Sequence, residues 1–371
     1  MSSFNQLTLG IIFFLIPLVF FSRFRKLFNF ISFLFILGSI FSLDIYSYTS
    51  DLIRYSDPSV IDYHITTLSI QDFLFFRISS FIYHFFDNRK IVIVFWQLLI
   101  LFNLIYAERL INNFSKKLKF DYLPGIFIYI VFITIGVQTI FNQIRYGVGF
   151  SFLIISIIYA LKFIYLKSSR DSYYSIFFIF LSAGMHTNAT SIFLLIPFGT
   201  LFLSKLRNFS KLQFYQKRIF NIPISMLIAL IALALLLTYF SRYLQTTIPY
   251  LPFFQNIWSI SATQYVELPT LNSLLLSSFY SIFNLLIAYR AIVNTNFVNS
   301  IPIFKLINLL GMFSIISLIF PLISRIASLC VFLPLPFFIA YNKSSGTYFF
   351  RLYYVLMAMV TIFRFESLFP S

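Results

Sequence analysis

The chain has 371 residues, of which 60% are hydrophobic and only 10% are charged. This composition excludes an ordinary soluble fold and intrinsic disorder. Cys330 is the single cysteine, so disulfide pairs and cysteine-based metal sites are excluded too. The net charge of +16 lies in short gaps between apolar runs. The aromatic residues lie inside those runs, where bases could not reach them, and nucleic-acid binding is therefore set aside.

Apolar runs of membrane-spanning length recur along the whole chain. A bilayer core of about 30 Å takes roughly 20 helical residues, and somewhat shorter spans are tolerated. The sequence therefore predicts an all-α, polytopic integral membrane protein of about twelve transmembrane helices, forming a single membrane domain over residues 1–371. The expected spans are 7–21, 27–43, 91–107, 122–140, 144–161, 173–185, 188–203, 222–240, 271–289, 303–320, 325–341 and 348–363.

The connections between these spans differ sharply in charge. Alternate connections hold 19 of the 27 Lys and Arg and 3 of the 11 acids, and the opposite set is neutral overall. By the positive-inside rule the basic side is cytoplasmic, which places both termini outside. Membrane lipids with anionic headgroups are the expected partners of the basic side.

The predicted outer side carries two long segments, at about 44–90 and 241–270. The first holds six of the eleven acids, at positions 44, 51, 57, 62, 72 and 87. Asp44 and Asp51 lie close to the membrane surface near Tyr48, where a carboxylate can act as a base or bind sugar hydroxyls. Within this segment the mostly apolar residues 73–86 predict an interfacial or re-entrant helix.

A second polar group lies at the outer junction of the fourth and fifth spans, in the sequence FNQIRYGVG. Asn142, Gln143 and Arg145 fall within one helical turn. An arginine at membrane depth is costly without a partner, and its planar fork matches phosphate oxygens two at a time. Snorkelling to lipid headgroups is the alternative reading of Arg145.

Two further candidates lie on the same predicted side. His186 lies at the outer turn between spans six and seven, and Arg325 lies at the outer start of span eleven. A structural hydrogen-bond donor is the alternative reading of His186. The three histidines have no paired metal spacing, so the sequence predicts neither a metal site nor a cofactor.

Four sequence features together resemble one family. They are Asp44 with Tyr48, FNQIRYGVGFSFLIISIIYALK, GMHTNATSIFLLIP and RIASLCVFLPLPFF. In this order they resemble the EpsG-like group of bacterial polysaccharide polymerases, related in role to the Wzy O-antigen polymerases. The most specific part is the pair of Arg145 and His186 at their spacing. Ser42-Leu43 stands where the family has Gly-Thr before its aspartate, so Asp44 and Asp51 both stay candidates.

The resemblance implies a membrane glycosyltransferase with a GT-C-like fold in the bacterial inner membrane. Its substrates would be undecaprenyl-diphosphate-linked oligosaccharide repeat units, joined on the periplasmic face. A chain-length regulator and a flippase of the same pathway are the protein partners that it allows. In this scheme Arg145 and Arg325 hold the diphosphate, helped by Arg54 and Arg77. The base is His186, Asp44 or Asp51, and sugar hydroxyls are oriented by Asn142, Gln143 and Tyr48.

Two other functions fit the composition. A lipid-linked oligosaccharide flippase would also have about twelve spans, but it should show two similar halves and charges within the spans. Neither feature is visible in this sequence. A membrane O-acyltransferase acting on surface sugars would also use a histidine and arginines, but its acyl donor must be reached from the cytoplasmic side.

Overall fold

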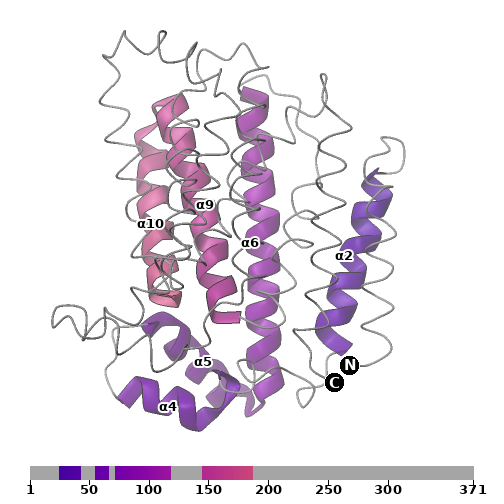
Figure 1. Cartoon of the computed structure of the whole chain (residues 1–371), viewed down its shortest axis with the longest axis vertical. Coiled ribbons are helices and arrows are strands. Elements are labelled where there is room, and N and C mark those ends of the chain that lie inside the picture. The colour runs from indigo at the N-terminus through magenta and orange to yellow at the C-terminus, as the bar shows by residue number, and fades with distance from the viewer. Residues whose placement is uncertain (1–24, 43–54, 67–71, 118–143, 187–371) are drawn as a thin grey trace, which may run out of the picture. The chain divides into compact units, whose positions relative to one another are not determined.

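The computed structural model describes residues 25–42, 55–66, 72–117 and 144–186, and this part of the chain is helical (Figure 1). These residues all belong to one compact unit. The helices are α2 (Arg25–Ser42), α4 (Pro58–Thr66), α5 (Phe73–Phe86), α6 (Arg89–Lys117), α9 (Ile144–Leu166) and α10 (Ser169–Met185).

Five of the expected helical segments fall on described residues, and all five are helices. The spans expected at 27–43, 91–107, 144–161 and 173–185 correspond to α2, α6, α9 and α10, and the segment 73–86 is α5. The remaining eight expected spans and the outer segment 241–270 lie outside the described residues. So do the two ends of the chain, and their periplasmic location stays a prediction.

One described helix is long and apolar enough to cross a membrane, over Arg89–Phe114. Two shorter apolar helices, Phe73–Phe86 and Ile144–Ala160, accompany it. The described part is thus compatible with an all-α membrane protein.

The helices α6, α9 and α10 pack side by side through small and polar residues (Figure 1). Asn103 of α6 donates to the Ser151 hydroxyl of α9 at 2.9 Å, and Ser156 of α9 donates to the Ser175 carbonyl of α10 at 2.8 Å. Ser182 of α10 donates to the Gly149 carbonyl at 2.7 Å. Short side chains of this kind allow close approach of helices and supply hydrogen bonds where water is scarce.

These contacts also fix the direction of the three helices. Tyr106 and Tyr159 meet at 2.5 Å between their hydroxyl oxygens, further along both α6 and α9 than the Asn103–Ser151 bond. The two helices are therefore parallel, whereas α10 is antiparallel to α9. The alternation of the loops predicts these relative directions, because it places the beginnings of 91–107 and 144–161 and the end of 173–185 on one side.

Helix α5 contacts both the beginning of α6 and the end of α10. Its Ser79 accepts a hydrogen bond from the Trp96 indole near the start of α6, at 2.9 Å. Phe75 stacks on the same indole with ring centroids 4.7 Å apart. In the same first turn of α5 as Phe75, Leu74 lies against Gly184 of α10, where an added Cβ would collide with the leucine side chain. The beginning of α5 is thereby held beside the end of α10.

Helix α4 is fixed at its beginning by Asp57. The Asp57 carboxylate accepts hydrogen bonds from the Ser59 N–H at 2.9 Å and from the Ser59 hydroxyl at 2.6 Å. Proline at the first helical position, as Pro58 is here, is preorganised for a helix. Asp57 also pairs with Arg89, the first residue of α6, at 3.1 Å. Together these contacts place the segment that begins at Tyr55 beside the beginning of α6.

Candidate functional site

An ion pair between Asp72 and Arg145 forms the centre of the candidate site. Asp72 immediately precedes α5 and has a left-handed backbone, with φ at 60°, a conformation that aspartate tolerates better than most residues. Its side chain does not cap α5. Instead its Oδ2 accepts a hydrogen bond from Arg145 Nη1 at 2.5 Å. The two side chains are only 7% and 19% exposed, so the pair is largely withdrawn from solvent.

Tyr55 occupies a second donor of the same guanidinium. Arg145 Nη2 donates to the Tyr55 hydroxyl at 2.9 Å, and the guanidinium carbon lies 4.3 Å from the centre of the Tyr55 ring. The Phe76 ring lies at 5.9 Å. A guanidinium close to aromatic faces is stabilised by the ring quadrupoles. Arg145 is thus surrounded by one carboxylate, one hydroxyl and two rings, which come from two other segments, Tyr55 before α4 and residues 72–76 at the start of α5.

His186 lies on the other oxygen of the Asp72 carboxylate. Its Nδ1 is 3.7 Å from Asp72 Oδ1, and its side chain is only 4% exposed. The Tyr146 ring lies edge-on to the imidazole, with centroids 5.7 Å apart and an interplanar angle of 85°. The His186 N–H donates to the Ser182 carbonyl at 2.9 Å, which continues the α10 hydrogen-bonding pattern by one residue. The histidine is therefore fixed by its backbone and packed against a ring, and its Nδ1 lies near a carboxylate, slightly beyond hydrogen-bonding distance.

Gly149 makes the position of His186 possible. A Cβ at residue 149 would lie 2.9 Å from the Cβ of His186 and 3.3 Å from the Ser182 carbonyl oxygen. Atoms do not approach so closely, so a larger residue would force the end of α10 away from α9. The glycine thus determines how far the histidine reaches toward Asp72.

The Asp72 carboxylate is shared, with one oxygen toward the guanidinium and one toward the imidazole. A carboxylate at Nδ1 favours the tautomer in which Nδ1 carries the proton and Nε2 can accept another, and it stabilises the imidazolium that results. The arrangement is suited to a general base next to a group that binds anions. No group of side chains able to hold a metal ion occurs among the described residues.

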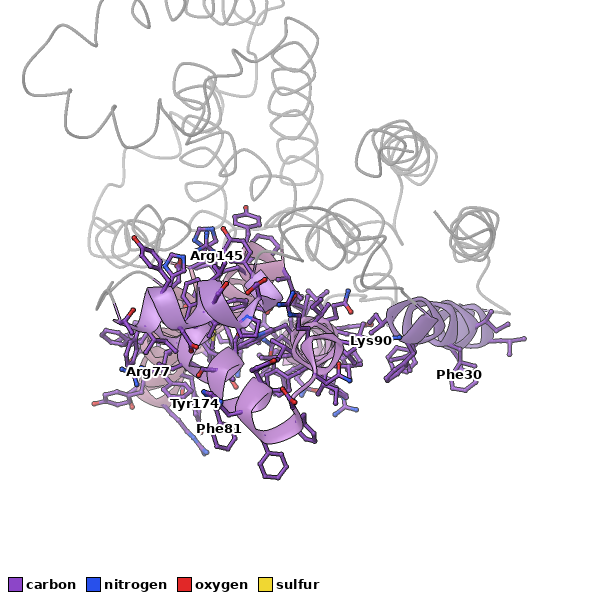
Figure 2. The ribbon with its side chains drawn as sticks, turned by 90° about the horizontal axis from the view of Figure 1, so that it is seen from below. Phe30, Arg77, Phe81, Lys90, Arg145 and Tyr174 are labelled. Atoms are coloured by element: carbon purple, nitrogen blue, oxygen red, sulfur yellow. The ribbon has the colours of Figure 1, made fainter. Side chains whose placement is uncertain are left out.

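The structure brings together two of the residues that the sequence singles out, Arg145 and His186. Arg77, expected as a helper, is exposed on α5 and lies over the Phe73 ring at 5.3 Å. In Figure 2 its label and that of Phe81 lie on the opposite side of the helices from Arg145. The structure thus places Arg77 apart from the ion pair. Seven other candidates lie outside the described residues: Asp44, Tyr48, Asp51, Arg54, Asn142, Gln143 and Arg325.

Sequence reasoning missed the roles of Asp72 and Tyr55. Asp72 is counted among the acids of the outer segment, and its position directly before an apolar helix is the one signal that separates it from the others. That position suggests a helix cap, which the structure does not show. The partners of Arg145 lie 73 and 90 residues away along the chain, beyond the reach of any local pattern.

Comparison of the chain with protein-family models, with curated proteins and with solved structures gives no match. The functional conclusion therefore depends on the sequence features and on the geometry of the Asp72–Arg145–His186 cluster.

Proposed function

We propose that this protein is a membrane glycosyltransferase that polymerises lipid-linked oligosaccharide repeat units on the outer face of the bacterial inner membrane. The observation that supports this proposal most is the Asp72 carboxylate, which joins a buried histidine to a largely buried arginine. Glycosyl transfer from a polyprenyl diphosphate needs a base for the attacking hydroxyl and a cation for the leaving group. The cluster contains one residue suited to each task.

The chemistry assigns one role to each member of the cluster. His186 Nε2 takes the proton of an acceptor sugar hydroxyl, and that oxygen forms a bond to the anomeric carbon of the donor glycan. The bond between this carbon and the diphosphate breaks, and polyprenyl diphosphate leaves with the bonding electrons. Arg145 stabilises the charge that develops on the leaving group. Asp72 is a positioning residue, which orients the imidazole and stabilises its protonated form.

The side of the protein on which the cluster lies agrees with this role. Asp72, Arg145 and His186 lie where α5 begins, α9 begins and α10 ends. The distribution of charge between the connections predicts that this side faces outward. Repeat units reach that side only after translocation, so a site there suits a polymerase better than a flippase.

The decisive experiment is the surface glycolipid profile of a strain that lacks this gene. A polymerase only joins units that have already been exported, so its loss should leave a product with one repeat and no ladder. A profile of bare acceptor with no one-repeat band would reject the proposal in favour of a flippase. A complete ladder that has lost an acyl substituent would identify a membrane acyltransferase instead.

A further inference from the structure

We infer that Tyr55 and Asp72 occupy Arg145 as placeholders, and that a diphosphate displaces them when donor binds. The inference rests on the proposed function, which supplies the polyprenyl diphosphate. In the structure one N–H of Nη1 is bound to Asp72 and one N–H of Nη2 to Tyr55. A guanidinium has five N–H donors, and a diphosphate that binds through these two requires Arg145 to exchange partners.

The energetics favour this exchange. A diphosphate carries at least two negative charges and several acceptor oxygens, whereas Asp72 offers one charge and Tyr55 a neutral hydroxyl. A charged acceptor binds a guanidinium more strongly than a neutral one, so Tyr55 is the weaker competitor. The Tyr55 ring can keep its position against Phe75 and Phe76, with centroids 6.3 and 6.2 Å away, while its hydroxyl gives up the guanidinium.

The exchange has a consequence for the base. When Arg145 turns to the diphosphate, Asp72 loses the cation that now balances it. The other basic group that the structure places at this carboxylate, within the described residues, is the imidazole, whose Nδ1 is 3.7 Å from Oδ1. A carboxylate freed in this way stabilises a protonated His186 more strongly, so the histidine accepts a proton more readily once donor is bound. Donor binding thus prepares the base.

Trp96 can report the exchange of partners at Arg145 through its fluorescence. Trp96 stacks on Phe75 at 4.7 Å, and Phe75 lies edge-on to Tyr55 at 6.3 Å. The chain has two tryptophans, so Trp258→Phe leaves Trp96 as the only one. In the purified full-length Trp258→Phe protein, titration with farnesyl diphosphate should give a saturable change in Trp96 fluorescence. Farnesol, which lacks the diphosphate, should give none.

Two variants in this background test the exchange. Tyr55→Phe keeps the ring and removes the competing hydroxyl, so farnesyl diphosphate should bind about tenfold more tightly, the value of one hydrogen bond to a charged group. Tyr63→Phe removes an exposed tyrosine hydroxyl on α4, the helix that follows Tyr55, so it is the matched control and should leave the affinity unchanged. Unchanged or weaker binding by Tyr55→Phe would overturn the inference.

Asp72→Asn distinguishes a role of Asp72 in positioning the His186 imidazole from a purely structural role. The amide is of the same size and can still accept from Arg145, but it no longer neutralises the guanidinium or stabilises an imidazolium. We expect tighter binding of farnesyl diphosphate together with at least a tenfold loss of polymer formation. Parallel losses of binding and polymer formation would mean that Asp72 is only structural, and the inference would fail.

The outcomes for the inference and for the proposed function are distinct. If the deletion strain shows bare acceptor while Tyr55→Phe still tightens binding, the polymerase is wrong and the anion exchange stands. If the deletion strain shows a one-repeat product while Tyr55→Phe has no effect on binding, the polymerase stands and the exchange is wrong.

Discussion

Arg145 shows how one side chain can be read differently from the sequence and from the structure. The sequence presents a cation at the start of a helix, where it could bind phosphate or reach toward lipid headgroups. The structure shows a guanidinium enclosed by Asp72, Tyr55 and Phe76 and only 19% exposed in its side chain. Leaving a charge without its partner in such surroundings costs several kcal/mol. Substitutions in this cluster therefore need a check of protein level alongside activity.

His186→Ala and Arg145→Ala should each lower polymer formation at least about a hundredfold, as is typical when an acid–base group or a charge-stabilising donor is lost. Polymer from a complemented deletion strain and an immunoblot for protein level are the measurements. Arg218→Ala, in a loop predicted to be cytoplasmic, is the control and should be nearly silent. Substantial polymer from His186→Ala would return the histidine to a structural role. Full activity of Arg145→Lys would show that a point charge suffices.

Gly149→Ala should displace His186 from Asp72, because the new Cβ would lie 2.9 Å from the His186 Cβ. Overpacking of this kind typically costs about 1–3 kcal/mol of stability. We expect a lower thermal midpoint of the purified protein and a loss of polymer larger than any loss of protein. Unchanged polymer formation would show that α10 can shift without disturbing the reaction.

At the scale of elements, α5 links the site to the rest of the described fold. One face packs inward through Phe75, Phe76 and Ser79, while Phe81 and Phe85 are more than 70% exposed. The large exposed aromatics agree with the interfacial helix that the sequence predicts for residues 73–86. Because Asp72 is the residue before this helix, any movement of α5 changes the position of the carboxylate that serves both Arg145 and His186.

Helix α4 should be sensitive to acid through Asp57. The Ser59 hydroxyl, which donates to the carboxylate, lowers the pKa of Asp57 below its ordinary value, and Arg89 adds to this. A carboxyl with a lowered pKa stabilises the fold above its unfolded value of about 3.9, and this contribution is lost as the pH falls through the folded pKa. The protection factors of residues 58–66 against hydrogen exchange, which correct for the slower intrinsic exchange in acid, should therefore fall below about pH 4.

Asp57→Asn is the matched variant for this effect. Asparagine caps helices about as well as aspartate, so α4 should stay protected from hydrogen exchange at neutral pH. Its protection factors should no longer fall in acid. Asp57→Ala should cost about 1 kcal/mol, the usual value of an N-cap. Equal acid dependence in the wild type and in Asp57→Asn would assign the effect to another group.

At the scale of the whole molecule, the parallel direction of α6 and α9 bears on the topology. Two parallel neighbours need a return crossing between them, and the sequence predicts a span at 122–140, outside the described residues. The segregation of charge, with +16 on one side and a neutral sum on the other, depends on counting every crossing correctly.

The predicted even number of spans places both termini on the same side, and the positive-inside rule predicts that this side is periplasmic. Alkaline phosphatase fused to the C-terminus should be active, since it folds only outside the cytoplasm, and a fusion of green fluorescent protein at the same position should stay dark. The reverse pattern would mean that the count is wrong by one or that the charge rule fails here. Fusions within the basic segment near residue 211 are the control. There alkaline phosphatase should be inactive and green fluorescent protein should fluoresce.

The sequence by itself determined that α2, α5, α6, α9 and α10 are helices, and it predicted both ends of α5. It did not predict α4, and α6 continues ten residues beyond the expected end at residue 107. The run 73–86 coincides with α5 because apolar residues stop at Asp72 and Asp87, and polar residues of this kind end a buried helix. Arg145 and His186 could be singled out because a charged or titratable group at membrane depth costs free energy, and such groups usually have a function. Such signals are local, and a single sequence contains them.

Only the tertiary structure decided that Asp72 joins Arg145 to His186 and that Tyr55 covers the guanidinium. These partners come from separate helices and turns, and the ion pair alone spans 73 positions of the chain. The one local feature that separates Asp72 from the other acids of its segment is its position directly before an apolar helix, and this suggests a helix cap rather than a partner for Arg145. Packing decides which acid pairs with Arg145. The close approaches of Leu74 to Gly184 and of Gly149 to His186 bring the beginning of α5 to the beginning of α9 and the end of α10.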